Sequence, residues 1–157
     1  MTNIGIDDKN RDQVGKILNR VLADEYVLYT KTRGYHWNVV GPQFNDLHKF
    51  FEGQYEELQD IIDDVAERGR SIGVHALGSL QEMLDEKSLE EDTTKGADSK
   101  HMLRSLLSDH EAIIRKLRVD LEKAAEKHKD MGTSDFLTGL MEKHEKMAWM
   151  LRSNLED

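Results

Sequence analysis

The feature that most constrains the fold of this chain is the recurrence of apolar residues every three or four positions along four long stretches. This spacing places apolar side chains on one face of an α-helix, and a single proline occurs among the 157 residues. We therefore predict an all-α chain with four long amphipathic helices. The expected helices cover residues 7–40, residues 42–71, residues 98 or 99 to about 128, and a last stretch that begins at Thr133 or Ser134.

Two residues mark the expected helix boundaries most clearly. Pro42 predicts the start of the second helix, because proline lacks the backbone N–H that the first helical position leaves unpaired anyway. Gly132 is expected to break the chain between the third and fourth helices.

Two pairs of metal-ligand side chains occur on the second predicted helix. His48 and Glu52 form one pair, and Asp63 and Glu67 form the other. At a spacing of four residues both members of a pair project from one face of the helix. His48 and Asp63 are 15 residues apart, which at 1.5 Å per residue is roughly 22 Å. Both pairs of one chain therefore cannot bind the same ion.

The position of these four residues around the helix indicates how the two pairs meet. With a turn of about 100° per residue, they lie beside the apolar stripe, which consists of Phe44, Phe51, Tyr55, Leu58, Ile62 and Val65. A second copy of the helix, packed antiparallel, would set the first pair of one chain against the second pair of the other. The two-fold axis would lie near Glu57 and Leu58. We therefore predict a composite site at a dimer interface, present twice per dimer.

His36, at the end of the first predicted helix, is a fifth candidate ligand. The alternative is a helix-end imidazole bonded to a backbone carbonyl, but four further ligands follow within one helix. Two imidazoles and three carboxylates suit Fe²⁺, which accepts both ligand types, and Fe³⁺, which prefers carboxylate oxygen. The alternative for the two pairs is a solvated, acidic helix face in which Arg68 or Arg70 pairs with the carboxylates.

The same region resembles the signature of the Dps-like miniferritins. The matching residues are His36, Trp37, Gly41, Phe44, Leu47, His48, Glu52, Tyr55, Asp63, Ala66, Glu67 and Arg68. The resemblance covers nearly the whole chain and implies a ferritin-like four-helix subunit in a hollow dodecamer built from two-fold dimers. It implies a ferroxidase centre that lies between subunits and holds about two iron ions at most. It also implies that hydrogen peroxide oxidises Fe²⁺ more readily than dioxygen does, and that ferric oxide stored in the shell protects DNA.

The resemblance assigns roles to four more residues. Trp37 is expected to be a redox-active neighbour that absorbs stray oxidising equivalents, with a ring packed at a subunit interface as an equal alternative. Glu126, Asp130 and Asp135 are expected to line the three-fold pore through which iron enters, because a ring of carboxylates concentrates cations. The alternative for these three is a polar helix end.

The connection between the second and third helices, residues 72–100, is long for a compact domain. We predict a short helix over residues 80–84 and a solvated turn over residues 90–96. A long crossover at this place is typical of ferritin-like topology. The whole chain, residues 1–157, is expected to form one domain, with residues 1–8 flexible.

Composition excludes several classes of function. The chain has no cysteine, so disulfides, iron–sulfur clusters and thiol catalysis are ruled out. No signal peptide or membrane span is expected, and the predicted location is the cytoplasm. A net charge of -9 and the absence of a basic residue before Lys9 argue against direct DNA binding. An architectural nucleoid protein that binds DNA directly remains the alternative function, and an iron-free scaffold is a third.

The remaining candidate residues are given structural roles. Glu25 is predicted to be a polar residue at a helix edge or in a hydrogen bond rather than a ligand. A diiron site inside the bundle, as in larger ferritins, is disfavoured because Glu-x-x-His motifs are missing from the third and fourth predicted helices. Surface or interface positions are predicted for His75, His101, His110, His128 and His144.

Overall fold

The computed structural model describes residues 2–156, and all regular structure in them is helical. The elements are α1 (Asp8–Asn38), α2 (Phe44–Ser71), α3 (Leu80–Glu86), α4 (Ser99–Glu122), a π-helical turn η1 (Lys123–Lys127) and α5 (Met131–Ser153). The four predicted long helices and the short helix in the connection are therefore confirmed. None of the helices in residues 2–156 is long and apolar enough to span a membrane.

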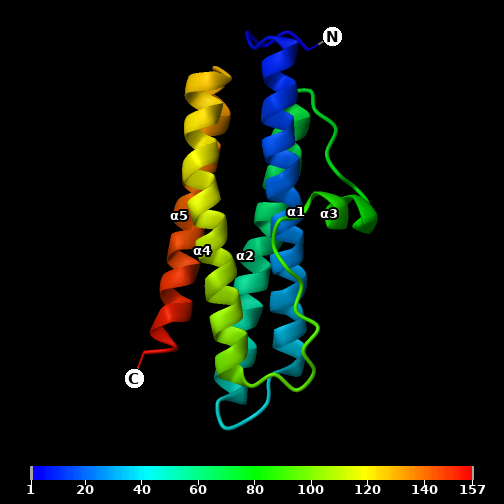
Figure 1. The fold of residues 1–157 in the computed structure, drawn as a ribbon. Coiled ribbons are helices and arrows are strands. Elements are labelled where there is room, and N and C mark those ends of the chain that lie inside the picture. Colours follow the sequence, from blue (N-terminus) through cyan, green and yellow to red (C-terminus); the bar gives the residue numbers. More distant parts are fainter. Residues whose placement is uncertain (1, 157) are drawn as a thin grey trace.

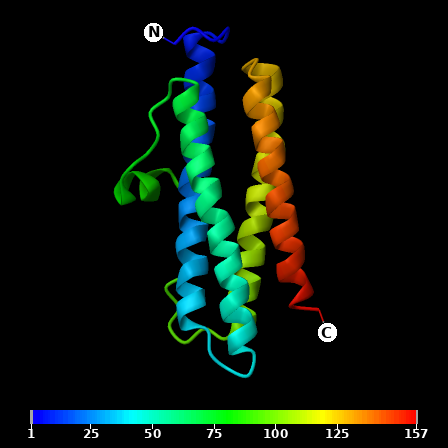
Figure 2. The same ribbon diagram turned by 180° about the vertical axis from the view of Figure 1, so that it is seen from behind.

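The four long helices form two antiparallel hairpins that pack side by side as a ferritin-like bundle. α1 pairs with α2, and α4 pairs with α5 (Figure 1). Contacts within each hairpin are much more extensive than contacts between the hairpins. The crossover from α2 to α4 runs from one end of the bundle to the other, with α3 lying outside α1 (Figures 1 and 2). The bundle core includes the fully buried side chains of Leu18, Leu22, Leu28, Phe51, Leu58, Leu106, Leu117, Leu137 and Leu151.

The turn between α1 and α2 differs from the prediction. α2 begins at Phe44 rather than at Pro42, and no side chain caps it. Gly41 has a φ of +114°, a conformation that residues with a Cβ rarely adopt. Its carbonyl accepts a hydrogen bond from the backbone N–H of Phe44. Pro42 therefore lies inside a tight turn instead of opening the helix.

The boundary between the last two long helices also differs. The third helical stretch continues through η1 to Lys127, close to the predicted end, but α5 begins at Met131 with Asp130 as its cap. The Asp130 carboxylate accepts bonds from the backbone N–H and the hydroxyl of Thr133, at 2.9 and 2.6 Å. Gly132 consequently lies in the first turn of α5, and the predicted cap at Thr133 or Ser134 is wrong.

The first helix begins at the end of the segment that was expected to be flexible, and the flexibility of residues 1–8 stays a prediction. Asp8 is the first residue of α1, and Asp7 caps the helix through a bond to the backbone N–H of Asn10. Thr2 fills the space beside Gly73. Met1, which the predicted flexible segment includes, lies outside the described residues.

The crossover is held to the bundle by two carboxylates, of which Asp24 is buried and Asp92 is partly buried. Asp24 on α1 accepts hydrogen bonds from the backbone N–H groups of Ser88 and Leu89, at 2.6 and 2.8 Å. Asp92 accepts bonds from the hydroxyl of Tyr35 and from Nε2 of His101. Residues 87–98 are thereby fixed against α1 and α4, although most of this segment has no helical structure.

Core packing predicts unequal effects of two matched substitutions. Val21 on α1 is 4% exposed, whereas Val119 on α4 is 51% exposed. Val21→Ala should lower the free energy of unfolding by about 1.5–3 kcal/mol, because buried methyl groups are lost. Val119→Ala shares the change in helix propensity and should stay within about 0.5 kcal/mol of the parent. Denaturation at one fixed protein concentration measures both, and equal losses would contradict the assignment of the core.

The carboxylate of Asp92 predicts a specific pH dependence. Bonds from the Tyr35 hydroxyl, from Thr94 and from His101 hold the pKa of Asp92 below its usual range. Its contribution to stability is therefore present above about pH 4 and lost as the pH falls through the lowered pKa. Asp92→Asn should reduce the melting temperature at pH 7 by about 3–8 °C. The difference from the parent should shrink below pH 4, and a difference that stays constant down to pH 3 would refute this role.

Candidate metal centre

His36 and His48 stack on one another where α1 ends and α2 begins. Their ring centroids lie 3.8 Å apart, and the ring planes differ by 18°. Nδ1 of His36 lies 2.7 Å from the carbonyl oxygen of His48, and Nδ1 of His48 lies 2.8 Å from the carbonyl oxygen of His36. The two residues are therefore joined by a reciprocal pair of hydrogen bonds.

These two bonds determine which nitrogen of each ring is free. A carbonyl oxygen only accepts hydrogen bonds, so each Nδ1 carries the proton and donates it. In the neutral ring, Nε2 then has a lone pair available for a metal ion. Metal-bound histidines usually have this arrangement, with the second ring nitrogen held by a backbone carbonyl or a carboxylate. Both rings are thus prepared as nitrogen ligands.

The end of α1 explains why the backbone takes part in this contact. The carbonyl of His36 is among the last four of α1, which have no donor within the helix. The tight turn at Gly41 reverses the chain and brings His48, early in α2, back against that carbonyl. The imidazole N–H thus satisfies a carbonyl that the helix leaves free, and the ligand pair also serves as a helix cap.

Aromatic rings surround the two histidines. Phe44 stacks on His48 with centroids 5.1 Å apart, and the edge of Tyr55 meets His36 at 5.2 Å. Burial and the negative charge of Glu52 raise the pKa of Tyr55, so its hydroxyl stays protonated at neutral pH. The rings cover His36, which is 7% exposed, and leave His48 partly accessible.

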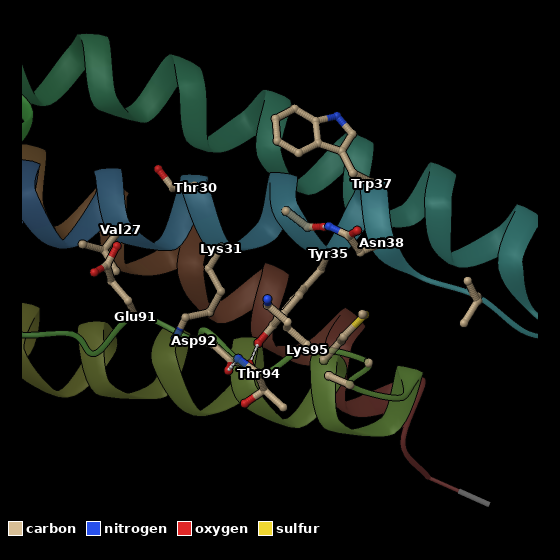
Figure 3. A pocket seen from close by; sticks show the side chains of 15 residues that line it. Val27, Thr30, Lys31, Tyr35, Trp37, Asn38, Glu91, Asp92, Thr94 and Lys95 are labelled. Carbon is tan, nitrogen blue, oxygen red and sulfur yellow. Dashed lines mark hydrogen bonds between the residues drawn. The ribbon is translucent and has the colours of Figure 1, made fainter.

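Trp37 lies outside this aromatic cluster. Its ring is 65% exposed, with the Arg33 guanidinium 5.4 Å from the ring centroid. It forms part of the wall of a cavity of about 640 Å³ between α1 and the crossover, to which Lys31 and Asp92 also contribute (Figure 3). Both roles suggested for Trp37, redox neighbour and interface residue, remain predictions.

The three candidate carboxylates lie in two places along α2. Glu52 is half-buried one turn after His48, whereas Asp63 and Glu67 are exposed near the other end of the helix. α2 is a helix of 28 residues, so the separation of roughly 22 Å between the two pairs stands. In the part of the chain that the structure describes, no three histidine or carboxylate side chains gather closely enough to hold a metal ion. One chain therefore presents two incomplete half-sites.

The two arginines considered as partners of the acidic pair bond elsewhere. Arg68 donates to the Asp130 carboxylate at 3.2 Å and to the Thr133 hydroxyl at 3.0 Å. Arg70 donates to the backbone carbonyl of Val74 at 3.0 Å. Neither arginine neutralises Asp63 or Glu67 through these bonds.

The three candidate pore residues are not equivalent. Glu126 on η1 and Asp135 on α5 are exposed, and their role in a pore remains a prediction. Asp130 is 3% exposed, and its carboxylate is occupied by the cap of α5 and by Arg68. The negative charge of Asp130 is therefore compensated inside the subunit, and its role in a pore also remains a prediction.

A second cluster of ligand-type side chains lies inside the bundle, where sequence reasoning did not place it. Glu25, His110 and His144 are fully buried, and their side chains form a hydrogen-bonded chain. The expected surface or interface positions of His110 and His144 are wrong. For Glu25, the hydrogen-bond alternative is confirmed and the helix-edge alternative is not. His128 is also buried, with Nδ1 3.1 Å from the side-chain oxygen of Asn10.

The signal for this cluster was present in the apolar repeat. Glu25, His110 and His144 each stand three or four residues from buried apolar residues of their own helices. Position in the repeat therefore predicts burial for these three residues, against the usual preference of their residue types for the surface.

Comparison with known sequences places the chain in the ferritin-like family. The profile described as "Ferritin-like domain" matches residues 15–157. An uncharacterized low temperature-induced protein of Nostoc sp. is 46% identical over 154 residues, which cover 98% of this chain and 86% of that protein. The DNA protection during starvation protein 2 of Bacillus anthracis is 38% identical over 143 residues, covering 91% and 97%.

Comparison with solved structures agrees with the sequence comparison. A Dps protein from Vibrio cholerae, described as a member of a broad superfamily of ferritin-like diiron-carboxylate proteins, superimposes with a TM-score of 0.92. It is 33% identical, and the match covers 99% of this chain and 97% of that one. DpsC from Streptomyces coelicolor gives a TM-score of 0.96 at 26% identity, covering 100% and 91%. This chain therefore belongs to the ferritin-like family and, within it, to the Dps-like miniferritins.

Proposed function

We propose that this protein is a ferroxidase and iron-storage protein that oxidises Fe²⁺ at a site shared by two subunits. The observation that carries the proposal is the reciprocal bonding of His36 and His48, which leaves both Nε2 atoms free for a metal ion. Glu52 adds a carboxylate one turn along α2. Two imidazoles and a carboxylate suit Fe²⁺ better than they suit Mg²⁺ or Ca²⁺, which prefer oxygen ligands.

The rest of the site would come from a second subunit. Asp63 and Glu67 are exposed on the same helix but roughly 22 Å from His48. Antiparallel packing of two α2 helices around a two-fold axis near Glu57 and Leu58 would bring them to the histidines of the partner. Each dimer would then contain two identical sites of two histidines and three carboxylates. Because hard Fe³⁺ prefers oxygen ligands, the added carboxylates would favour the oxidised ion.

The assembly and the protective role rest on the relatives. Proteins named for DNA protection during starvation match more than nine-tenths of this chain. By analogy with them, we propose that this protein forms a dodecameric shell that stores ferric oxide. It would use hydrogen peroxide in preference to dioxygen and so remove Fe²⁺ and peroxide, the two reactants that generate hydroxyl radicals. Fe²⁺ and hydrogen peroxide would be the substrates, and about two iron ions per site would be bound at once.

The shared site predicts a characteristic pattern of loss and recovery. His36→Ala and Asp63→Ala should each abolish rapid oxidation of anaerobically loaded Fe²⁺ by peroxide. When the two variants are refolded together in equal amounts, half of the dimers are mixed. Each mixed dimer has one intact site, so about a quarter of the parent activity should return. Stopped-flow absorbance of ferric iron measures all of these rates.

Two matched variants control for unspecific damage. His75→Ala removes an exposed histidine, and Asp64→Ala removes the exposed carboxylate next to Asp63. Both should oxidise Fe²⁺ at the parent rate. If the mixed assemblies recover no activity although His36→Ala and Asp63→Ala each assemble correctly, the site would lie within one subunit.

The alternative function, direct binding to DNA, is disfavoured by charge. The chain carries a net charge of -9, and binding to phosphates depends on lysine and arginine contacts. We expect no shift of linear duplex DNA in a gel at about 150 mM salt without Mg²⁺. A shift that persists at that salt concentration would support the architectural alternative.

A further inference from the structure

Three fully buried polar side chains connect the two hairpins in the middle of the bundle. Oε1 of Glu25 on α1 lies 2.7 Å from Nε2 of His144 on α5. Nδ1 of His144 lies 2.9 Å from Nδ1 of His110 on α4. All three residues have no exposed surface. The chain thus crosses the boundary between the α1–α2 and α4–α5 hairpins, where helix contacts are fewest.

The number of protons on this chain follows from its geometry. Two ring nitrogens that face each other at 2.9 Å must have one proton between them. If both histidines are neutral and Glu25 is ionised, the buried cluster carries a full negative charge, which is costly inside a protein. One more proton, shared by Glu25 and His144, makes the cluster neutral. In that state His144 donates from Nδ1 to His110 and bonds Glu25 through Nε2.

No neighbouring charge substitutes for this proton. Beside Glu25, Asp24 is bound by the crossover and Arg20 is paired with Asp120. Two lysines, on α4 and on α1, are also engaged by other carboxylates. Lys116 lies near Asp24 and Ser88, Lys31 is paired with Asp109, and Gln54 on α2, which is neutral, donates to the carbonyl of Met147. The charge of Glu25 is therefore compensated within the cluster.

We propose that Glu25, His144 and His110 form a buried proton-binding site that holds α1, α4 and α5 together at neutral pH and weakens their packing in acid. A further proton would have to bind to Nδ1 of His110. The two Nδ1 atoms would then both carry hydrogens and face each other, which breaks the bond between α4 and α5. The second cation would also lie in the core with only one carboxylate to compensate it.

The sign of the pH dependence is set by His110. Burial, and secondly the charge of His144, lower the pKa of His110 well below its ordinary value of 6.5. The unfolded or opened chain therefore takes up the proton first as the pH falls. Stability from neutral His110 is complete above pH 6.5 and decreases below it, and the opening constant rises up to tenfold per pH unit.

Hydrogen exchange of the intact assembly tests this proposal. Exchange of amides in α4 and α5, corrected for the intrinsic effect of pH, gives opening constants between pH 6.5 and 4.5. We expect the parent protein to open up to tenfold more for each pH unit below 6.5. His110→Asn puts an amide oxygen where Nδ1 accepts the bond and removes the titrating group, so its opening constants should change less than twofold. The exposed His75→Asn variant should behave as the parent does.

A second variant keeps the test decisive if His110→Asn does not fold. Glu25→Gln removes the charge that favours the shared proton, so opening should take up two protons instead of one, and the opening constants should rise up to a hundredfold for each pH unit below 6.5. If His110→Asn opens in acid as the parent does, or if Glu25→Gln opens with the same dependence on pH as the parent, the proposal is overturned. Because this experiment does not measure iron oxidation, a result against the buried proton site would not count against the proposed metal centre.

Discussion

The reciprocal hydrogen bonds between His36 and His48 are the interaction on which the account of this protein depends. They close the end of α1 against the start of α2, and they place a proton on each Nδ1 so that each Nε2 is left for a metal ion. The contact requires the tight turn at Gly41, and Glu52 follows one turn later on α2. Because α2 is a single long helix, Asp63 and Glu67 lie far from the histidines of the same chain, and in the proposed function a second subunit completes the set.

Most of the fold was predictable from the apolar repeat, and the errors occur at two helix ends. The predictions at Pro42 and Gly132 use only the residue type at each position. Asp130 instead caps α5 through bonds from Thr133, and its carboxylate also meets Arg68, which lies 62 positions earlier in the chain. Neighbouring residues do not reveal this distant contact, which supports Asp130 over Thr133 or Ser134 as the cap. At Pro42 the positive φ of Gly41 starts a turn that delays the helix by two residues.

The candidate residues of the site could be proposed from the sequence, but the hydrogen bonds and stacking between His36 and His48 could not. Spacing alone identified His48 with Glu52 and separated them from the acidic pair, whereas the stacking of His48 on His36 depends on how the turn folds. The buried cluster was missed for a different reason. His110 and His144 were assigned by the usual exposure of histidine, although their positions in the repeat predict core residues. For such residues, the position in the apolar repeat therefore predicts burial better than the residue type does.

The central claim, that two subunits complete one iron site, is tested most directly by crystals of the assembled protein soaked anaerobically in a ferrous salt. Anomalous scattering at the iron edge locates the metal without assumptions about its ligands. The account predicts iron between His36, His48 and Glu52 of one subunit and the partner's Asp63 and Glu67. Iron bound only by residues of a single subunit, or no iron at the two-fold interface, would contradict it.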